Sequence, residues 1–294
     1  MLMKSSNEKL KTQPKFLNEI ISKIIQEEAP DNEVAVLMSG GTDSLSIAIA
    51  AHDLGKKLNC YTFRIKGIDS PDSLASEKAC QHFNWNLNII DVPIDNIEND
   101  FFTLINKYQC RKKTHVECTF PFLYVYPNIR EKYVLTGWAA DGYYGVSKRA
   151  NIHFKHTKEL IDEFRRKYFG QLDQNTQKFT VDNPVGIKQQ MLLSESINSV
   201  LVAPYVDKKV WDWMIQHDWK YFNKPYQKAP IFEAFPKLKE IKKRDHLNLQ
   251  LAANIPSYFE KLLDNDKINI HNRGRMIDLM RDWYPTSNLE DFFI

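Results

Sequence analysis

Residues 33 to 46 read EVAVLMSGGTDSLS, an apolar run followed by two glycines and then by hydroxyl and acidic side chains. A short run rich in valine and leucine that stops at glycine is typical of a buried β-strand. The residues from 43 to 55 continue with helical spacing and end near Gly55. A strand, a glycine turn and a helix in this order form the first half of a parallel βαβ unit, so the stretch predicts an α/β fold.

The same alternation continues through the first half of the chain. Strands are predicted at residues 33–38, 59–65, 87–92 and 132–137, and helices at residues 43–55, 70–84, 95–108 and 117–129. Ser70 followed by Pro71 is a capping residue followed by proline in the first turn, which marks a helix start. We therefore expect a doubly wound, mostly parallel sheet of five strands with helices on both faces.

The flanking regions are expected to be helical. Apolar residues recur at helical spacing over residues 15–28, and beyond residue 150 the strand signals fade. Helices are predicted in this second half at residues 156–172, 187–201, 207–219 and 254–266. The expected organisation is an N-terminal helix in residues 1–32, an α/β core in residues 33–150, and a mainly helical part in residues 151–294 that packs on the core and completes the site.

Composition narrows the class of protein. The chain has 294 residues, 43% of them hydrophobic, and 40 basic against 37 acidic residues leave a charge of +3, too small to indicate a nucleic-acid or membrane partner. The N-terminus lacks an apolar signal-peptide core, which predicts a cytoplasmic protein. Cys110, His115 and Cys118 lie close together, but their spacing matches no common zinc pattern, so free thiols are expected.

The glycine loop itself suggests a chemistry. In an open parallel sheet, ligands bind beyond the carboxyl ends of the strands, where this loop lies. Gly40 and Gly41 permit close approach, and amides at a helix N-terminus suit an anion. Asp43 would repel phosphate unless a divalent cation such as Mg²⁺ lay between them. No lysine follows the glycines, so this is not a Walker A loop, and an ordinary turn with Asp43 as helix N-cap stays open as the alternative.

The segment SGGTDS (39–44) resembles the SGGxDS motif of the PP-loop ATP pyrophosphatases. Three further segments, in family order, resemble the synthetase domain of asparagine synthetase and its relatives, the β-lactam synthetases. They are YVLTGWAADGYYG (133–145), APYVDKKVW (203–211) and QKAPIFEAFPKLKEIKKRDHLNLQ (227–250). The resemblance implies a HUP-like fold with a nucleotide-binding core at residues 33–150, ATP and Mg²⁺ as cofactors, and cleavage of ATP to AMP and pyrophosphate.

The resemblance also implies roles for individual residues. Asp43 and Asp141 would hold the metal, and Trp138 would line the acceptor pocket. The positions implied for ATP or pyrophosphate are Leu37, Ser39, Gly40, Gly41, Thr42, Asp43, Ser44, Phe63, Thr136 and Gly137, and the catalytic positions are Lys228, Lys243, Arg244 and His246. For Leu37 and Phe63 core packing is an equal alternative, and a solvated basic helix face is the alternative for the lysines near residue 240.

The departures from the family pattern gather on the acceptor side. Trp138 stands where the family has a glutamate, and a tryptophan cannot accept a proton. His246 replaces a lysine and Phe232 replaces an arginine, while Val200 and Val202 occupy the E-x-R positions. The residues expected around ATP and magnesium are kept, so the acceptor is expected to differ.

The leading hypothesis is an ATP-dependent ligase that adenylates a carboxylate and transfers it to ammonia or an amine. Leu2 follows the initiator methionine where a glutamine-using synthetase has cysteine, so we expect no amidotransferase domain. Ammonia would then come from a separate subunit or from solution, or an amine would replace ammonia. One alternative is adenylation of a nucleobase or tRNA oxygen, with Cys110 or Cys118 as a sulfur carrier. The other is a nucleotide-binding or interaction module that has lost catalysis.

Overall fold

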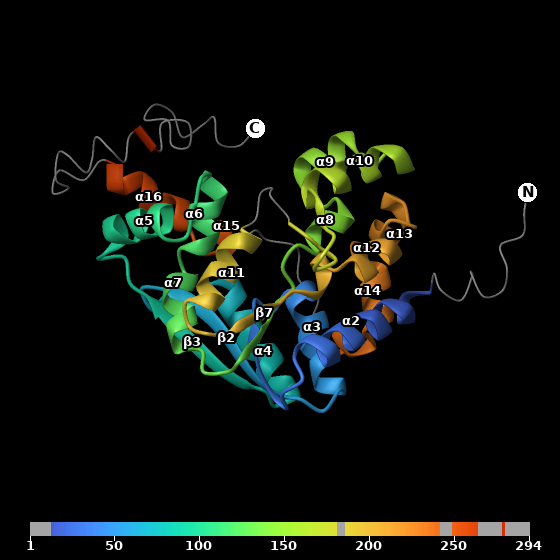
Figure 1. Ribbon diagram of the computed structural model, residues 1–294, viewed down its shortest axis with the longest axis horizontal. Coiled ribbons are helices and arrows are strands. Elements are labelled where there is room, and N and C mark those ends of the chain that lie inside the picture. Colours follow the sequence, from blue (N-terminus) through green and yellow to red (C-terminus); the bar gives the residue numbers. More distant parts are fainter. Residues whose placement is uncertain (1–12, 181–185, 242–248, 264–277, 280–294) are drawn as a thin grey trace, which may run out of the picture.

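A five-stranded parallel sheet runs through the computed structural model, which describes residues 13–180, 186–241, 249–263 and 278–279 (Figure 1). The strands are β1 (Glu33–Leu37), β2 (Lys57–Ile65), β3 (Asn86–Val92), β4 (Tyr133–Leu135) and β7 (Val200–Val202). Their order is β3-β2-β1-β4-β7, and every neighbouring pair is parallel. The doubly wound α/β fold predicted from the sequence is confirmed.

Both faces of the sheet are buried. Val34 and Val36 of β1 belong to one apolar cluster, whereas Ala35 and Leu37 belong to another, because alternate residues of a strand point to opposite faces. The first cluster is covered by α2 (Pro14–Glu28), α3 (Thr42–Asp53) and α4 (Pro71–Phe83), and the second by α5 (Ile97–Asn106), α7 (Phe122–Val125) and α16 (Ile255–Leu263). A continuous apolar strand such as β1 is the expected result of burial on both sides.

Helix α4 begins where its sequence predicts. Ser70 is the N-cap residue, and its hydroxyl accepts a hydrogen bond from the amide of Ser73 at 3.1 Å, while the Ser73 hydroxyl accepts from the amide of Ser70 at 2.8 Å. Pro71 follows at the first helical position, where its missing N–H costs nothing. The reciprocal cap fixes the start of α4, and the backbone of this helix at Ala75 packs against Gly40 of the glycine loop.

Three predicted helices are wrong in extent, and the mildest case is the segment 207–219, in which the helix covers only Lys208–Met214 (α12). The segment 117–129 is broken into α6 (Lys113–Thr119), α7 and a 3-10 turn (Tyr126–Asn128), because Pro121 and Pro127 lack the amide hydrogens that a continuous helix needs. The segment 187–201 forms α11 (Ile187–Glu195) only. Its last part becomes β7, where β-branched valines extend the sheet beside β4. The fifth strand therefore comes from the part of the chain expected to be helical.

The chain after β4 is otherwise mainly helical, as predicted for the residues beyond 150. It contains α8 (Asp141–Tyr144), α9 (Lys148–His153), α10 (Lys158–Phe169), α12 (Lys208–Met214), α13 (Trp219–Asn223), α14 (Ala229–Ala234) and α15 (Leu249–Ala252), with 3-10 turns at Pro204–Val206 and Pro236–Glu240 and a short hairpin of β5 (Leu172–Asp173) and β6 (Lys178–Phe179). In Figure 1, α8, α9 and α10 stand above the sheet on one side, and α6, α15 and α16 on the other. No helix within the described ranges is long and apolar enough to cross a membrane.

Arg165 ties this helical part to the segment that follows β4. Its side chain is fully buried in α10, and its Nε donates to the carbonyl of Tyr143 at 2.9 Å. Nη1 donates to the carbonyl of His217 at 2.7 Å and to Asp162 at 3.0 Å. A buried guanidinium with these partners fixes α10 against α8, the short helix that begins at Asp141.

Candidate functional site

Two loops meet at the point where the strand order reverses. From β1 the chain winds outward to β2 and β3, and then returns to place β4 on the other side of β1. The segments that leave β1 and β4 are therefore neighbours at the carboxyl edge of the sheet, the usual ligand position in such folds. Their closeness is evident at Gly137, where an added Cβ would lie 2.5 Å from the carbonyl carbon and oxygen of Asp43.

The glycine loop leads into helix α3 without a side-chain cap. The helix begins at Thr42, and its N-cap is Gly41, so the alternative of Asp43 as N-cap is wrong. Gly40 has φ +65°, and an added Cβ would lie 2.5 Å from the backbone of Ala75 in α4. Glycine is thus required at residue 40, and the first turn of α3 remains a suitable site for an anion.

The hydroxyls of Ser39 and Ser44 hold the loop in shape. Ser44 is buried; its Oγ accepts from the amide of Ser39 at 3.3 Å and donates to the carbonyl of Gly41 at 3.1 Å. The Ser39 Oγ accepts from the amide of Gly41 at 3.3 Å. Both serines were expected to contact phosphate. That contact stays a prediction; in the structure their hydroxyls form hydrogen bonds within the loop, where they pre-organise its backbone.

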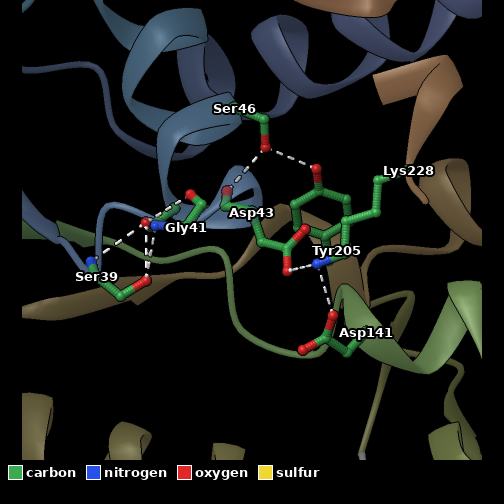
Figure 2. A network of polar contacts seen from close by, with 8 residues as sticks. Ser39, Gly41, Asp43, Ser46, Asp141, Tyr205 and Lys228 are labelled. Carbon is green, nitrogen blue, oxygen red and sulfur yellow. Dashed lines mark hydrogen bonds and ion pairs between the residues drawn. The ribbon is translucent and has the colours of Figure 1, made fainter. Parts of the chain in front are cut away.

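The carboxylates of Asp43 and Asp141, predicted to hold the metal, converge as expected. They are 98 positions apart in the sequence. Asp43 comes from the first turn of α3 and Asp141 from the start of α8, and Figure 2 shows both pointing at the ammonium of Lys228. The Lys228 Nζ lies 2.7 Å from Asp43 Oδ2 and 2.7 Å from Asp141 Oδ1. Three residues that the sequence assigned to one site are therefore in direct contact.

Lys228 occupies a constrained position. Its side chain is 7% exposed, its Nζ lies 4.9 Å from the centre of the Tyr144 ring, and its backbone is left-handed with φ +62° at the N-cap of α14. Burial acts to lower the pKa of Lys228, but the charges of Asp141 and Asp43 outweigh it and raise the pKa. The lysine is thus kept cationic between two carboxylates, and a non-glycine residue in this conformation is a form of strain that gathers at functional sites.

Tyr205 and Ser46 support Asp43 from behind, and neither was singled out from the sequence. The Ser46 hydroxyl donates to the carbonyl of Asp43 at 2.8 Å and lies 2.8 Å from the Tyr205 hydroxyl (Figure 2). Because the single hydroxyl hydrogen of Ser46 goes to Asp43, Tyr205 is the donor to Ser46. Tyr205 lies in the segment APYVD (203–207), which resembles a family motif, and this resemblance could have marked Tyr205 as a candidate site residue.

The family follows from a comparison with known proteins. Residues 29–180, more than half of the chain, match the model of the asparagine synthase family. The chain belongs to the asparagine synthase family. This confirms the resemblance seen in the sequence, including the PP-loop class to which the family belongs, and makes the chain a member of an ATP-using family.

Other comparisons are more distant. No curated protein matches the sequence. A solved structure described as a predicted subunit of a tRNA methyltransferase from Methanocaldococcus jannaschii is 15% identical, with 63% of this chain and 75% of that chain covered and a TM-score of 0.33. NMN synthetase from Francisella tularensis is 13% identical, with 81% and 99% covered and a TM-score of 0.35. Neither likeness supports an inference about the site.

Trp138 lies in the segment between β4 and α8, where the resemblance to asparagine synthetase implies a glutamate. Its ring is half-buried and packs edge-on against Phe122 at 5.5 Å, and its amide donates to the Thr136 hydroxyl at 3.2 Å. The next residue, Ala139, has φ +72°. A left-handed alanine costs about 1–2 kcal/mol relative to the ordinary conformation, so the turn between Trp138 and Asp141 is held by its surroundings.

The remaining predicted residues fall into three groups. Leu37 and Phe63 are each 6% exposed and belong to the apolar core, as the packing alternative predicts, and their contact with ATP stays a prediction. Thr42 is partly exposed at the start of α3. The predicted catalytic residues Lys243, Arg244 and His246 lie outside the described residues.

The cysteines lie buried as free thiols. Burial raises the pKa of the Cys110 and Cys118 thiols to about 12 in each case. Such thiols are poor nucleophiles, since the thiolate is the reactive form. Within the described residues, no cluster of three or more His, Cys, Asp or Glu side chains is arranged to hold a metal, so the metal site considered below rests on two carboxylates.

Proposed function

We propose that this asparagine synthase family member is an AMP-forming, ATP-dependent carbon–nitrogen ligase. It adenylates a carboxylate and transfers the acyl group to ammonia or an amine. The observation that carries the proposal is the convergence of Asp43 and Asp141 on one cation beside a glycine loop at a helix N-terminus. That combination supplies ligands for a metal and backbone donors for phosphate in one place.

Asp43 and Asp141 fit magnesium as ligands. Mg²⁺ is typically bound through one or two protein carboxylates, with water and phosphate oxygens completing its octahedron. The structure brings one oxygen of each carboxylate to a single cationic group, and this convergence supports a shared metal ion. When bound, the metal would supply positive charge against the phosphate oxygens of ATP.

The proposed reaction has two steps, and in each of them one bond forms and one breaks. A carboxylate oxygen of the substrate bonds to the α-phosphorus of ATP, and the bond from that phosphorus to the bridging oxygen breaks, with the electron pair leaving on pyrophosphate. The nitrogen of ammonia or an amine then bonds to the acyl carbon and loses a proton, while the acyl carbon's bond to the AMP oxygen breaks.

The residues of this chain bind and orient the reactants. The first-turn amides of α3 and the loop at Gly41 would hold the β- and γ-phosphates, and Lys228 would offset charge on the leaving pyrophosphate. The ring of Trp138 would line the acceptor pocket and shield it from water, which favours a bulky or cyclic acceptor over a small one. Because its indole cannot take up a proton, the base for the amine must be another group.

A matched set of aspartate variants tests the proposal. Pyrophosphate release is measured with ATP, Mg²⁺ and a panel of carboxylates and amines, for the unmodified protein and for Asp43→Asn, Asp141→Asn and the control Asp53→Asn. Asp53 ends the same helix α3 and pairs with exposed Lys237. Loss of a metal-holding carboxylate should slow release on the order of a thousandfold, with the control unaffected. Full activity in Asp43→Asn or Asp141→Asn would sink the site assignment.

The alternatives predict other outcomes. The basic segment FRRK (164–167) would serve a nucleic-acid target only if its side chains were available, and Arg165 is fully buried. A non-catalytic module would bind the nucleotide but release no pyrophosphate with any acceptor. We also propose a cytoplasmic location, which the free buried cysteines support.

A further inference from the structure

We propose that Lys228 makes metal binding at Asp43 and Asp141 conditional on a polyphosphate anion, so that metal and nucleotide enter the site together. The inference rests on the proposed function and adds a role for Lys228 in the order of binding. In it, the ammonium holds the two carboxylates until phosphate oxygens arrive. The ammonium would then move to the phosphates and leave Asp43 and Asp141 to hold the metal.

The first step is the competition between the two cations. Lys228 Nζ lies 2.7 Å from one oxygen of each carboxylate, the same two groups that a magnesium ion would need. An ammonium at hydrogen-bonding distance from both cannot remain there while a divalent ion binds both, because the two cations would repel each other in a half-buried site. The metal must therefore displace Lys228 or bind weakly.

The second step is the strength with which Lys228 is held. Both of its ion pairs are charge-assisted hydrogen bonds of short length, and only 7% of its side chain and 17% of the Asp43 side chain are exposed. The Tyr144 ring lies beneath the ammonium. A surface lysine would give way to a metal readily, whereas this buried one would have to leave two partly exposed carboxylates, Asp43 at 17% and Asp141 at 36%, and an aromatic face.

The third step is the alternative partner that a polyphosphate provides. The glycine loop would place phosphate oxygens at the start of α3, one residue from Asp43. Those oxygens offer Lys228 a new anionic partner and offer the metal additional ligands. A bound nucleotide would thus draw Lys228 away from the carboxylates and add oxygen ligands for the metal, which predicts strong positive coupling between metal and nucleotide.

A purely structural role for Lys228 predicts a different result. If the lysine only tethers α14 to the two loops, its removal would lower stability and leave the intrinsic affinity of the carboxylates for a metal unchanged or reduced. If it competes with the metal, its removal would raise that affinity when no nucleotide is present. The sign of the change in metal affinity therefore separates the two roles.

The test measures Mn²⁺ binding by electron paramagnetic resonance, which follows loss of the free-ion signal. The full-length protein is compared with Lys228→Met and with the control Lys237→Met, whose lysine pairs with the single exposed carboxylate of Asp53. Each is titrated with and without α,β-methylene ATP, which resists cleavage between the α- and β-phosphates. We expect the unmodified protein and Lys237→Met to bind Mn²⁺ at least tenfold more tightly with the analogue. Lys228→Met should bind Mn²⁺ at least tenfold more tightly than the unmodified protein without it.

The outcomes are distinguishable. If the unmodified protein binds Mn²⁺ equally well with and without the analogue, or if Lys228→Met shows no gain, the conditional role of Lys228 is refuted while the ligase proposal stands. If none of the proteins binds Mn²⁺ under any condition, both proposals fail. A melting temperature that Mn²⁺ alone raises in Lys228→Met but not in Lys237→Met would support the competition between lysine and metal, and equal shifts in the two variants would count against it.

Discussion

Gly137→Ala should disable the site while leaving the fold intact. The new Cβ would lie 2.5 Å from the carbonyl carbon and oxygen of Asp43 and 2.7 Å from the amide nitrogen of Ser44. All three are backbone atoms at the start of α3, so no flexible side chain can move aside. Ordinary contact needs about 3.5 Å, and the loop after β4 must therefore shift by roughly 1 Å. This shift carries Asp141 away from Asp43.

The expected effect is large on catalysis and moderate on stability. A displacement of 1 Å in a catalytic array costs on the order of a hundredfold in rate, and overpacking costs about 1–3 kcal/mol of folding free energy. Gly55→Ala is the control: its φ is +77° with no atom within 4 Å of the new Cβ, so it should cost about 1–2 kcal/mol through backbone strain alone. Pyrophosphate release and urea unfolding are measured for both. Equal activities in the two variants would refute the packing argument.

Two further predictions concern groups around the site. Tyr205→Phe removes the hydroxyl that donates to Ser46 behind Asp43, so urea unfolding should show a loss of about 1 kcal/mol; an unchanged free energy of unfolding would mean that this hydrogen bond contributes nothing. The pKa of half-buried His115 is lowered, first by burial and then by the charge of Lys112, so the unfolded chain takes up the proton more readily. Stability should therefore fall as the pH drops below about 6.5, and His115→Asn should show a smaller fall than the unmodified protein between pH 7.5 and 5.5.

The sequence predicted the elements that local chemistry determines. Ser70 and Pro71 specify the start of α4, and the apolar run before Gly40 specifies β1. The closeness of Asp43 and Asp141 was predictable, because each follows a strand and parallel strands bring their carboxyl ends to one edge of the sheet. These signals are carried by a few neighbouring residues, which is why they could be recognised without a structure.

Other features depend on partners distant in the chain. Val200 and Val202 follow a helix and become a strand only because the edge of β4 is available to pair with them. The contacts of Lys228 with both carboxylates, and of Tyr205 with Ser46, join segments more than 80 residues apart. Sequence placed Lys228 among the catalytic candidates, but the position of its ammonium is a property of tertiary packing.

The most direct test is a crystal structure with α,β-methylene ATP and Mg²⁺ bound. We predict the β- and γ-phosphates against the loop at Gly41 and the first turn of α3, one metal ion held by both Asp43 and Asp141, and the Lys228 ammonium on a phosphate oxygen. A nucleotide bound elsewhere, or a metal that touches neither carboxylate while Lys228 still joins them, would contradict the assignment of this site.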